Sequence, residues 1–219
     1  MKYRAEDIRA EYDEAADSPD EFEKVKWGSQ EKMLNRFRLA MAKLDFSNAK
    51  RWLDVGCGTG AFQTLVLKAH PTVEAVGIDI SPKLLDFART RPLAGAASFI
   101  QCDFMFFEDA PFDIITCVGV LQKTTFTPEE FFRRAVHLLR DGGALFVDTK
   151  NIGWKRFAEP DFFPEREHEW FSVEELSAAA RAAGFVIVEL NGFLPGEGLV
   201  TAPEESHTVF IVARKGAGT

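Results

Sequence analysis

One short stretch of the chain combines a carboxylate with glycines at alternate positions, a pattern typical of a ligand-binding turn. Residues 51–60 read Arg-Trp-Leu-Asp-Val-Gly-Cys-Gly-Thr-Gly, so that Asp54 is followed by Gly56, Gly58 and Gly60. Because glycine has no Cβ, alternate glycines let the backbone pass close under a ligand, and they open a helix whose first N–H groups are free. A turn of this kind beside a carboxylate suits a ligand with ribose hydroxyls and a positive charge better than one with phosphates.

Two further acids occupy equivalent places later in the chain. Asp79 closes an apolar run over residues 74–80, and Asp103 directly follows another run over residues 97–102. Open parallel sheets bind ligands at the carboxyl ends of their strands. We therefore expect Asp54, Asp79 and Asp103 to face one common cleft.

The elements that must position these acids alternate between strand and helix patterns. Trp52, Leu53 and Val55 are typical of a buried parallel strand. Helix signals separate the apolar runs, among them an N-cap followed by proline at residues 81–82 and a capping box at residues 127–130. This alternation predicts a parallel sheet covered by helices on both faces. The expected strands are residues 52–55, 74–80, 97–102, 112–118 and 144–148, the last after a turn at residues 141–143.

The alternation ends after residue 150. A helix capped by Ser172 and closed by Gly184 precedes two strand patterns, at residues 185–190 and 208–213, with no helix between them. Two consecutive strands with no helix between them are typical of antiparallel neighbours. We therefore expect an antiparallel pair at the edge of the sheet.

Helical patterns also precede the first strand. Residues 4–16 and 19–45 look helical, and Gly28-Ser29 is expected to break the longer segment. We therefore divide the chain into an N-terminal helical cap, residues 1–46, and an α/β domain, residues 47–219.

Charge and composition exclude several classes of partner. The chain has 219 residues with 26 Lys and Arg against 34 Asp and Glu, a formal net charge of −8. Such a surface repels a nucleic-acid backbone, and no apolar run is long enough to span a bilayer. The charged N-terminus lacks the apolar core of a signal peptide. Cys57, Cys102 and Cys117 are odd in number and fit buried thiols better than disulfides or metal ligands, which predicts a cytoplasmic protein with no bound metal.

Several motifs in order make the chain resemble the class I S-adenosylmethionine-dependent methyltransferases, over roughly residues 48–215. The resemblance implies a seven-stranded, Rossmann-like, mostly parallel sheet in which the last strand is antiparallel and inserted before the sixth. It also implies S-adenosylmethionine as cofactor and S-adenosylhomocysteine as product. The motifs are Leu-Asp-Val-Gly-Cys-Gly-Thr-Gly at 53–60, Gly-Ile-Asp-Ile-Ser at 77–81, Gln-Cys-Asp-Phe at 101–104, Phe-Asp-Ile-Ile at 112–115 and Leu-Leu-Arg-Asp-Gly-Gly-Ala-Leu at 138–145.

The resemblance also assigns roles to individual residues. Asp79 would accept both ribose hydroxyls, and Ile80 would pack on the adenine. Asp103 would accept from the exocyclic amine of the adenine, and Phe104 would flank the ring. The other cofactor contacts implied are the turn of Gly56, Cys57, Gly58 and Gly60 under the methionine part, Asp54 or nearby backbone groups near its amino group, Val118 in the stretch beside the sulfonium, and Tyr12 in an N-terminal Tyr-Asp element that covers the cofactor.

Other interpretations compete with these roles. A dinucleotide site also places an acid about twenty residues after its glycines, but its fingerprint is G-x-G-x-x-G, whereas the glycines here alternate. Asp103 has a second interpretation as the cap of a short turn. A non-catalytic module that only binds the cofactor would have no need to keep all three acids.

The methyl acceptor is predicted to be a small molecule. Members that methylate nucleic-acid amino groups carry an Asn/Asp-Pro-Pro-aromatic motif after strand four, and residues 117–122 here read Cys-Val-Gly-Val-Leu-Gln instead. His168 is the candidate general base, although residues 167–169 also fit a solvated acidic stretch. Trp27 and the aromatic residues at 154–171 suit an acceptor pocket under a lid or simple packing of that lid. Lys123, Lys150, Lys155 and Arg156 could receive an acidic group, so an aromatic or an acidic acceptor is expected. The oligomeric state is left open.

Overall fold

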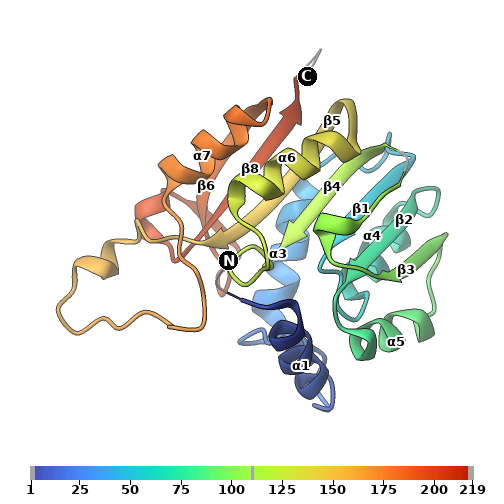
Figure 1. The fold of residues 1–219 in the computed structure, drawn as a ribbon, viewed down its shortest axis with the longest axis horizontal. Helices are drawn as coiled ribbons and strands as arrows, with labels where there is room; N and C mark the ends of the chain where they lie inside the picture. Colours follow the sequence, from blue (N-terminus) through green and yellow to red (C-terminus); the bar gives the residue numbers. More distant parts are fainter. Residues whose placement is uncertain (1–2, 110, 217–219) are drawn as a thin grey trace.

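An eight-stranded sheet forms the centre of the computed structural model, which describes residues 3–109 and 111–216 (Figure 1). The strand order is β3-β2-β1-β4-β5-β8-β6-β7. Neighbours from β3 to β5 are parallel, whereas β8 is antiparallel to β5 and β6, and β7 is antiparallel to β6. The strands are β1 (Arg51–Val55), β2 (Glu74–Asp79), β3 (Ala97–Gln101), β4 (Phe112–Val118), β5 (Leu139–Lys150), β6 (Phe185–Leu194), β7 (Leu199–Thr201) and β8 (Thr208–Lys215).

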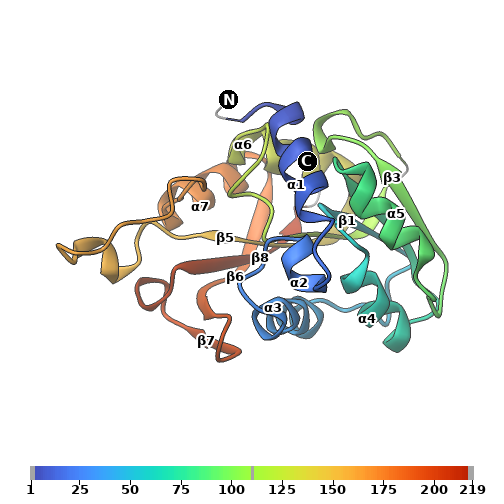
Figure 2. The same ribbon diagram turned by 90° about the horizontal axis from the view of Figure 1, so that it is seen from below.

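Helices cover both faces of this sheet (Figure 2). Helices α6 and α7 pack on one face through residues such as Phe131 and Leu176, and α3 and α4 pack on the other through Phe37 and Phe62. The helices are α1 (Ala5–Ala15), α2 (Glu21–Lys24), α3 (Gln30–Lys43), α4 (Ala61–Ala69), α5 (Pro82–Thr90), α6 (Pro128–Leu138) and α7 (Val173–Ala182), with short 3-10 turns η1 (Phe104–Phe106), η2 (Lys155–Ala158) and η3 (Pro203–Glu205).

Alternation along β1 decides which way its acid points. Leu53 and Val55 belong to the core beneath α6 and α7, whereas Trp52 belongs to the core beneath α3 and α4. Successive side chains of a strand point to opposite faces. Asp54 therefore lies on the Trp52 side of the sheet, towards α3 and α4.

Capping signals in the sequence account for where several helices begin. Thr127 and Glu130 form the reciprocal capping box of α6, and Ser81 caps α5 through the N–H of Leu84. The break expected at Gly28-Ser29 is confirmed, because α2 ends at Lys24 and Ser29 caps α3. These hydrogen bonds satisfy helix N–H groups that no intrahelical carbonyl can reach.

The sheet differs from the expectation in strand number and in two boundaries. The antiparallel edge and the insertion of the last strand before the sixth are confirmed, but there are eight strands rather than seven. The additional strand, β7, pairs with an extension of β6 beyond residue 190. β5 begins at Leu139 rather than at residue 144, because residues 140–143 bulge between two paired stretches of the same strand. The short β7 carries too few residues to show a period in the sequence.

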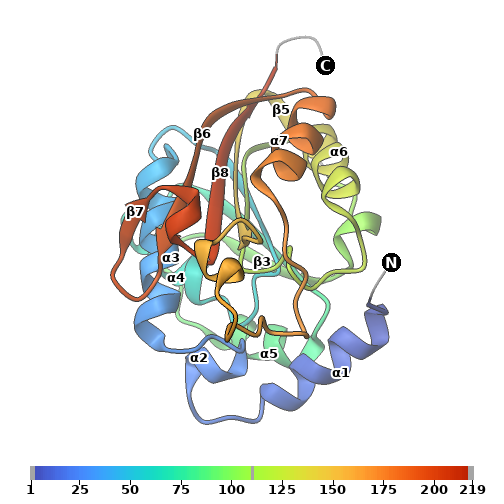
Figure 3. The same cartoon turned by 90° about the vertical axis from the view of Figure 1, so that its left-hand side faces the viewer.

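Helices α1 and α2 lie near the carboxyl ends of the parallel strands, whereas α3 packs on one face of the sheet (Figures 1 and 3). Asp13 of α1 accepts a hydrogen bond from Ser81 Oγ over 2.6 Å, which joins the cap to the start of α5. The three cysteines are free thiols. Across the residues that the structure describes, no helix combines the length and apolarity that crossing a bilayer requires.

Candidate functional site

A cavity opens at the carboxyl ends of β1, β2 and β4, beneath the N-terminal helices. It encloses about 740 Å³ of empty space, part of it open to solvent. Asp54 and Cys57 line a smaller cavity beside it, and Gly60 lines neither. The predicted site residues in the wall of the main cavity are Tyr12, Gly56, Gly58, Asp79, Ile80, Asp103, Phe104 and Val118.

The glycine turn is drawn tightly against the end of β2. The N–H groups of Gly56 and Cys57 donate to the carbonyl of Ile78 over 2.8 and 3.0 Å. Gly56 has a φ of 70°, and a Cβ there would lie 2.3 Å from a methyl group of Val120. A side chain at position 56 would therefore clash with the turn after β4, where the methyl acceptor is expected. Gly60 instead caps α4 and packs against Ala88.

Asp79 presents its carboxylate to the cavity while two backbone groups hold it in place. Gly58 N–H donates to its Oδ2 over 2.8 Å, and Ser81 N–H donates to its Oδ1 over 2.9 Å. A carboxylate has about four acceptor positions, so both oxygens keep acceptor capacity for a further donor. Burial raises the pKa of Asp79 above its ordinary value, and the backbone hydrogen bonds oppose that change.

Asp103 combines the two roles weighed for it in the sequence. Its Oδ1 accepts the N–H of Met105 over 2.9 Å and thereby caps η1, and its Oδ2 accepts the hydroxyl of Thr125 over 2.7 Å. Asp103 also lines the main cavity, and Phe104 beside it packs 5.7 Å from the ring of Phe126. The turn interpretation is therefore correct for the protein's own contacts, while the predicted contact with adenine stays a prediction.

The expectation that all three acids face one common cleft is wrong for Asp54, which is withdrawn from the main cavity into a buried polar cluster. Gln63 Nε2 donates to its Oδ2 over 2.9 Å, and Thr116 Oγ1 donates to its Oδ1 over 2.6 Å. Burial raises the pKa of Asp54 to about 7 against these hydrogen bonds. The cluster fixes the turn from below, and Asp54 borders the smaller cavity that shares Gly56 and Val118 with the main one.

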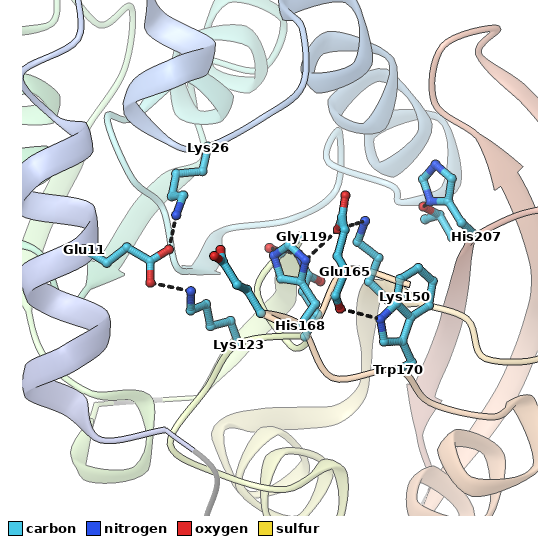
Figure 4. A network of polar contacts seen from close by, with 12 residues as sticks. Glu11, Lys26, Gly119, Lys123, Lys150, Glu165, His168, Trp170 and His207 are labelled. Atoms are coloured by element: carbon cyan, nitrogen blue, oxygen red, sulfur yellow. Dashed lines mark hydrogen bonds and ion pairs between the residues drawn. The ribbon is translucent and has the colours of Figure 1, made fainter. Parts of the chain in front are cut away.

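Helix α1 and the α2–α3 connection form the outer wall. Tyr12 lines the main cavity, and burial together with the charge of Asp79 raises the pKa of its phenol, which therefore stays protonated. Glu11 beside it forms ion pairs with Lys123, which lines the cavity, and with Lys26 (Figure 4). The N-terminal helices are thus attached to the cavity rim by side chains rather than by a shared strand.

The turn after β4 is held between the cap and the end of β5. Gly119 has a φ of 70°, and its N–H donates to Asp148 Oδ1 over 2.6 Å. Asp148 also accepts a hydrogen bond from Arg36 Nη1 over 3.1 Å, and the guanidinium lies 4.7 Å from the Trp27 ring. A Cβ on Gly119 would lie 2.8 Å from that ring. Trp27 therefore lies directly over the turn.

His168 lies close to this turn, in the segment that follows β5. Its Nδ1 is 2.7 Å from Glu165 Oε2 (Figure 4). The N–H of Glu169 donates to the carbonyl of Gln122 over 2.8 Å, and Gln122 Nε2 donates to the carbonyl of Gly119 over 2.6 Å. Burial lowers the pKa of His168 below its ordinary value, with Glu165 opposing that change and Lys150 and Lys123 adding to it.

The aromatic residues of the segment after β5 do not share one role. Trp154, Phe157, Phe162 and Trp170 pack edge to face on one another, which is the packing interpretation raised in the sequence. Phe163 is 83% exposed. The remaining aromatic residues of the prediction divide between the core, which contains Phe171, and the wall of the main cavity, which contains Trp27.

Three polar residues of the site were missed in the sequence. Asp148 follows the rule that identified the other acids, because it lies near the carboxyl end of a parallel strand. Arg36 gave no signal, since a charged residue on an amphipathic helix is normally solvated. Glu165 gave little signal, because its contacts with Lys150 and His168 depend on how the segment folds back.

The chain matches the family described as "Methyltransferase domain" over residues 13–190. Among curated relatives, the protein named "Ubiquinone biosynthesis O-methyltransferase" from Xanthomonas oryzae pv. oryzae is 36% identical over 184 residues, covering 74% of this chain and 73% of the relative. The protein of the same name from Xylella fastidiosa is 34% identical over 161 residues, covering 65% of this chain but only 63% of the relative.

Solved structures share the fold at lower identity. An S-adenosylmethionine-dependent methyltransferase from Mesorhizobium loti superposes with a TM-score of 0.68 at 19% identity, covering 83% of this chain and 98% of that one. The N-methyltransferase NodS from Bradyrhizobium japonicum, solved with S-adenosylhomocysteine, gives a TM-score of 0.68 at 17% identity, covering 94% and 97%.

The residues of the main cavity fit the cofactor of this family. The carboxylate of Asp79 has free acceptor positions for ribose hydroxyls, and Ile80 and Phe104 offer apolar surface for an adenine. Gly56 and Gly58 of the glycine turn line the same cavity, and their lack of a Cβ lets a ligand such as the methionine part approach the backbone. The chain therefore belongs to the class I S-adenosylmethionine-dependent methyltransferases, enzymes whose methyl donor is S-adenosylmethionine.

Proposed function

We propose that this protein transfers a methyl group from S-adenosylmethionine to a hydroxyl group of a small molecule, with His168 as the general base. The observation that carries the proposal is a histidine, bonded to a carboxylate, that is joined through Glu169 and Gln122 to the turn at Gly119. The names of the relatives support an oxygen acceptor, because those proteins are O-methyltransferases of ubiquinone biosynthesis.

Proton removal is the step for which the protein's own residues are needed. When bound, S-adenosylmethionine supplies a methyl group on a positively charged sulfur, so that a C–S bond breaks as the C–O bond forms. The acceptor hydroxyl must lose its proton as it attacks, and a base with a pKa near or below the ambient pH is suited to take that proton. The lowered pKa of His168 keeps the imidazole neutral at pH 7, which leaves one ring nitrogen able to accept a proton.

Charges near the base favour an aromatic or acidic acceptor. Lys123 and Lys150 lie at the ends of β4 and β5 with side chains only 8% and 14% exposed. Trp27 adds an aromatic surface over Gly119. The net charge of −8 argues against a nucleic-acid acceptor, and three free thiols favour a reducing cytoplasm as the place of action.

Transfer of a labelled methyl group tests the proposal. The full-length protein is incubated with methyl-labelled S-adenosylmethionine and, separately, phenol, catechol, 3,4-dihydroxybenzoic acid, a small-molecule cell extract and total RNA. We expect label in an organic-soluble methyl ether, identified by mass spectrometry, and a loss of at least about a hundredfold in kcat for His168→Gln, the usual contribution of a general base. His137→Gln, on the exposed side of α6, serves as the matched control.

Two outcomes would overturn the proposal in different parts. Label in RNA, or no transfer by a protein that still binds S-adenosylhomocysteine, would refute a small-molecule acceptor. Full activity of His168→Gln would refute the base alone and would favour catalysis by positioning, which suffices when the acceptor is already deprotonated.

A further inference from the structure

A lysine, a glutamate and a histidine form one continuous contact beside the proposed acceptor site. Lys150 Nζ lies 2.9 Å from Glu165 Oε2, and His168 Nδ1 lies 2.7 Å from the same oxygen (Figure 4). Lys150 belongs to β5, whereas the other two residues belong to the segment that follows it. One carboxylate oxygen therefore joins the candidate base to the sheet.

Further contacts fix this arrangement on β5. Trp170 Nε1 donates to the backbone carbonyl of Glu165 over 3.2 Å, and the Lys150 ammonium lies 5.2 Å from the Trp170 ring. The N–H of Phe171 donates to the carbonyl of Lys150 over 3.1 Å. The Lys150 side chain is 14% exposed, against 60% for Glu165. The buried Lys150 side chain is therefore the fixed partner, and it restrains the more exposed side chain of Glu165.

We propose that Lys150 is a positioning residue that acts through Glu165 to hold His168 as the neutral tautomer protonated on Nδ1, with Nε2 free for the acceptor hydroxyl. This inference rests on the proposed role of His168 as base. A carboxylate that accepts from Nδ1 specifies which ring nitrogen carries the proton. Without Lys150, Glu165 would be free to turn towards solvent, and the tautomer would no longer be fixed.

The charges around the imidazole act in the direction that this role requires. Burial favours the protonated form of Glu165, but the hydrogen bond and charge of Lys150 bring its pKa below the ordinary value. Glu165 raises the pKa of His168, whereas Lys150 and Lys123 lower it. The groups that face the cluster from neighbouring elements are Lys123 after β4 with its partner Glu11 on α1, Arg36 and Lys32 on α3, and His207 before β8.

The tautomer of His168 in two variants distinguishes this arrangement from ordinary packing. Lys150→Met should mix the two neutral tautomers of His168, because Glu165 is then free to turn away from Nδ1. Loss of the lysine charge raises the pKa of His168 and loss of the Glu165 contact lowers it, so the tautomer rather than that pKa is the readout. Removing the negative charge in Glu165→Gln should lower that pKa and mix the two tautomers. Lys150→Arg, which keeps the charge, should keep His168 protonated on Nδ1 and hold its pKa within about 0.3 units of the original.

Histidine NMR on the full-length protein with S-adenosylhomocysteine measures these changes without a methyl acceptor. The 15N shifts report the protonation of each ring nitrogen, and the loss of one signal in His168→Gln assigns the residue. Lys155→Met is the matched control, because Lys155 lies in the same segment and pairs with Glu205 instead. Circular dichroism checks that each variant folds. If Lys150→Met does not fold, the comparison of Glu165→Gln with Lys150→Arg still tests the inference.

A His168 that keeps the tautomer protonated on Nδ1 in Lys150→Met would overturn the inference. So would a wild-type His168 protonated on Nε2 rather than on Nδ1. The result is separable from the proposed function, because retention of kcat by His168→Gln would refute the base and leave these titrations to decide the electrostatic coupling.

Discussion

At the scale of single residues, Asp79 has the most direct part in binding the cofactor. Its carboxylate is held by two backbone N–H groups and still borders the main cavity. One of those groups belongs to Gly58, so the acid and the glycine turn position each other. A ligand with two vicinal hydroxyls would meet a fixed acceptor that needs no rearrangement, which lowers the entropic cost of binding.

Replacing Asp79 should weaken cofactor binding without unfolding the site. We expect Asp79→Asn to raise the dissociation constant of S-adenosylhomocysteine by about a hundredfold or more, because each hydrogen bond to a charged group contributes about 1.5–3 kcal/mol. Isothermal titration calorimetry measures the change. Asp86→Asn is a suitable control, since Asp86 lies on the exposed side of α5 and pairs with Arg89 of the same helix. Equal affinities of the two variants would refute the ribose assignment.

At the scale of elements, acidic side chains of the N-terminal helices attach these helices to residues around the cavity. Glu11 pairs with Lys123 and Lys26, and Asp13 accepts from Ser81. Farther along, Glu21 of α2 pairs with Arg91. Exposed ion pairs of this kind contribute little to global stability, yet several together can set how readily a cover opens.

The attachment of α1 should govern how fast the cofactor leaves. We expect Glu11→Gln to increase the dissociation rate of S-adenosylhomocysteine by about three- to tenfold, since the loss of a half-buried ion pair amounts to about 1 kcal/mol. Stopped-flow fluorescence can follow release, because Trp27 lies in the cavity wall.

Glu14→Gln, on the exposed side of the same helix, provides the matched control for this experiment. Raised salt should reduce the difference between Glu11→Gln and the wild type, since salt screens surface charges. A dissociation rate that is the same in Glu11→Gln and Glu14→Gln would show that α1 is not a gate.

At the scale of the whole molecule, one buried arginine connects the N-terminal helical cap to strands β5 and β8. Arg36 of α3 donates to Asp148 of β5 and, over 3.0 Å, to Thr208 Oγ1 of β8. Asp148 in turn accepts the N–H of Gly119. The cap, the last strand and the turn at the acceptor site are thereby joined through one guanidinium, and the side chains of the pair are 8% and 0% exposed.

Breaking this pair should destabilise the protein more at high pH than at low pH. Burial raises the pKa of Asp148 and Arg36 opposes that change, so Arg36→Met leaves a buried carboxylate whose pKa rises further above its unfolded value of about 3.9. The stability of such a group is present below its unfolded pKa and is lost as the pH rises through the folded pKa. We expect a loss of about 3–5 kcal/mol in the free energy of unfolding at pH 8, and less at pH 5.

Urea denaturation at the two pH values measures the effect. The double variant Arg36→Met/Asp148→Asn should recover much of the loss, because no unpaired charge is then buried. Arg38→Met, at an exposed position of the same helix, should leave the free energy of unfolding nearly unchanged. A loss that is the same at pH 5 and pH 8 would contradict the assignment of this cost to Asp148.

Local signals determined much of the fold and of the cofactor side of the site. Apolar runs, capping residues such as Ser81 and Thr127, and alternate glycines are each encoded within a few neighbouring residues. The rule that ligands bind at the carboxyl ends of parallel strands then placed Asp79 and Asp103 at one cavity without coordinates. These inferences held because hydrophobic periodicity and turn chemistry depend on the chain nearby.

Tertiary structure alone decided the features that depend on contacts between distant residues. The face on which Asp54 is buried, the pairing of Arg36 with Asp148 across 112 positions, and the return of Glu165 to Lys150 are of this kind. A charged side chain has the same local signature whether it is solvated or paired, because its partner comes from another element. The sequence therefore predicted what cofactor the protein holds, whereas only the folded chain decided which charges surround the candidate base.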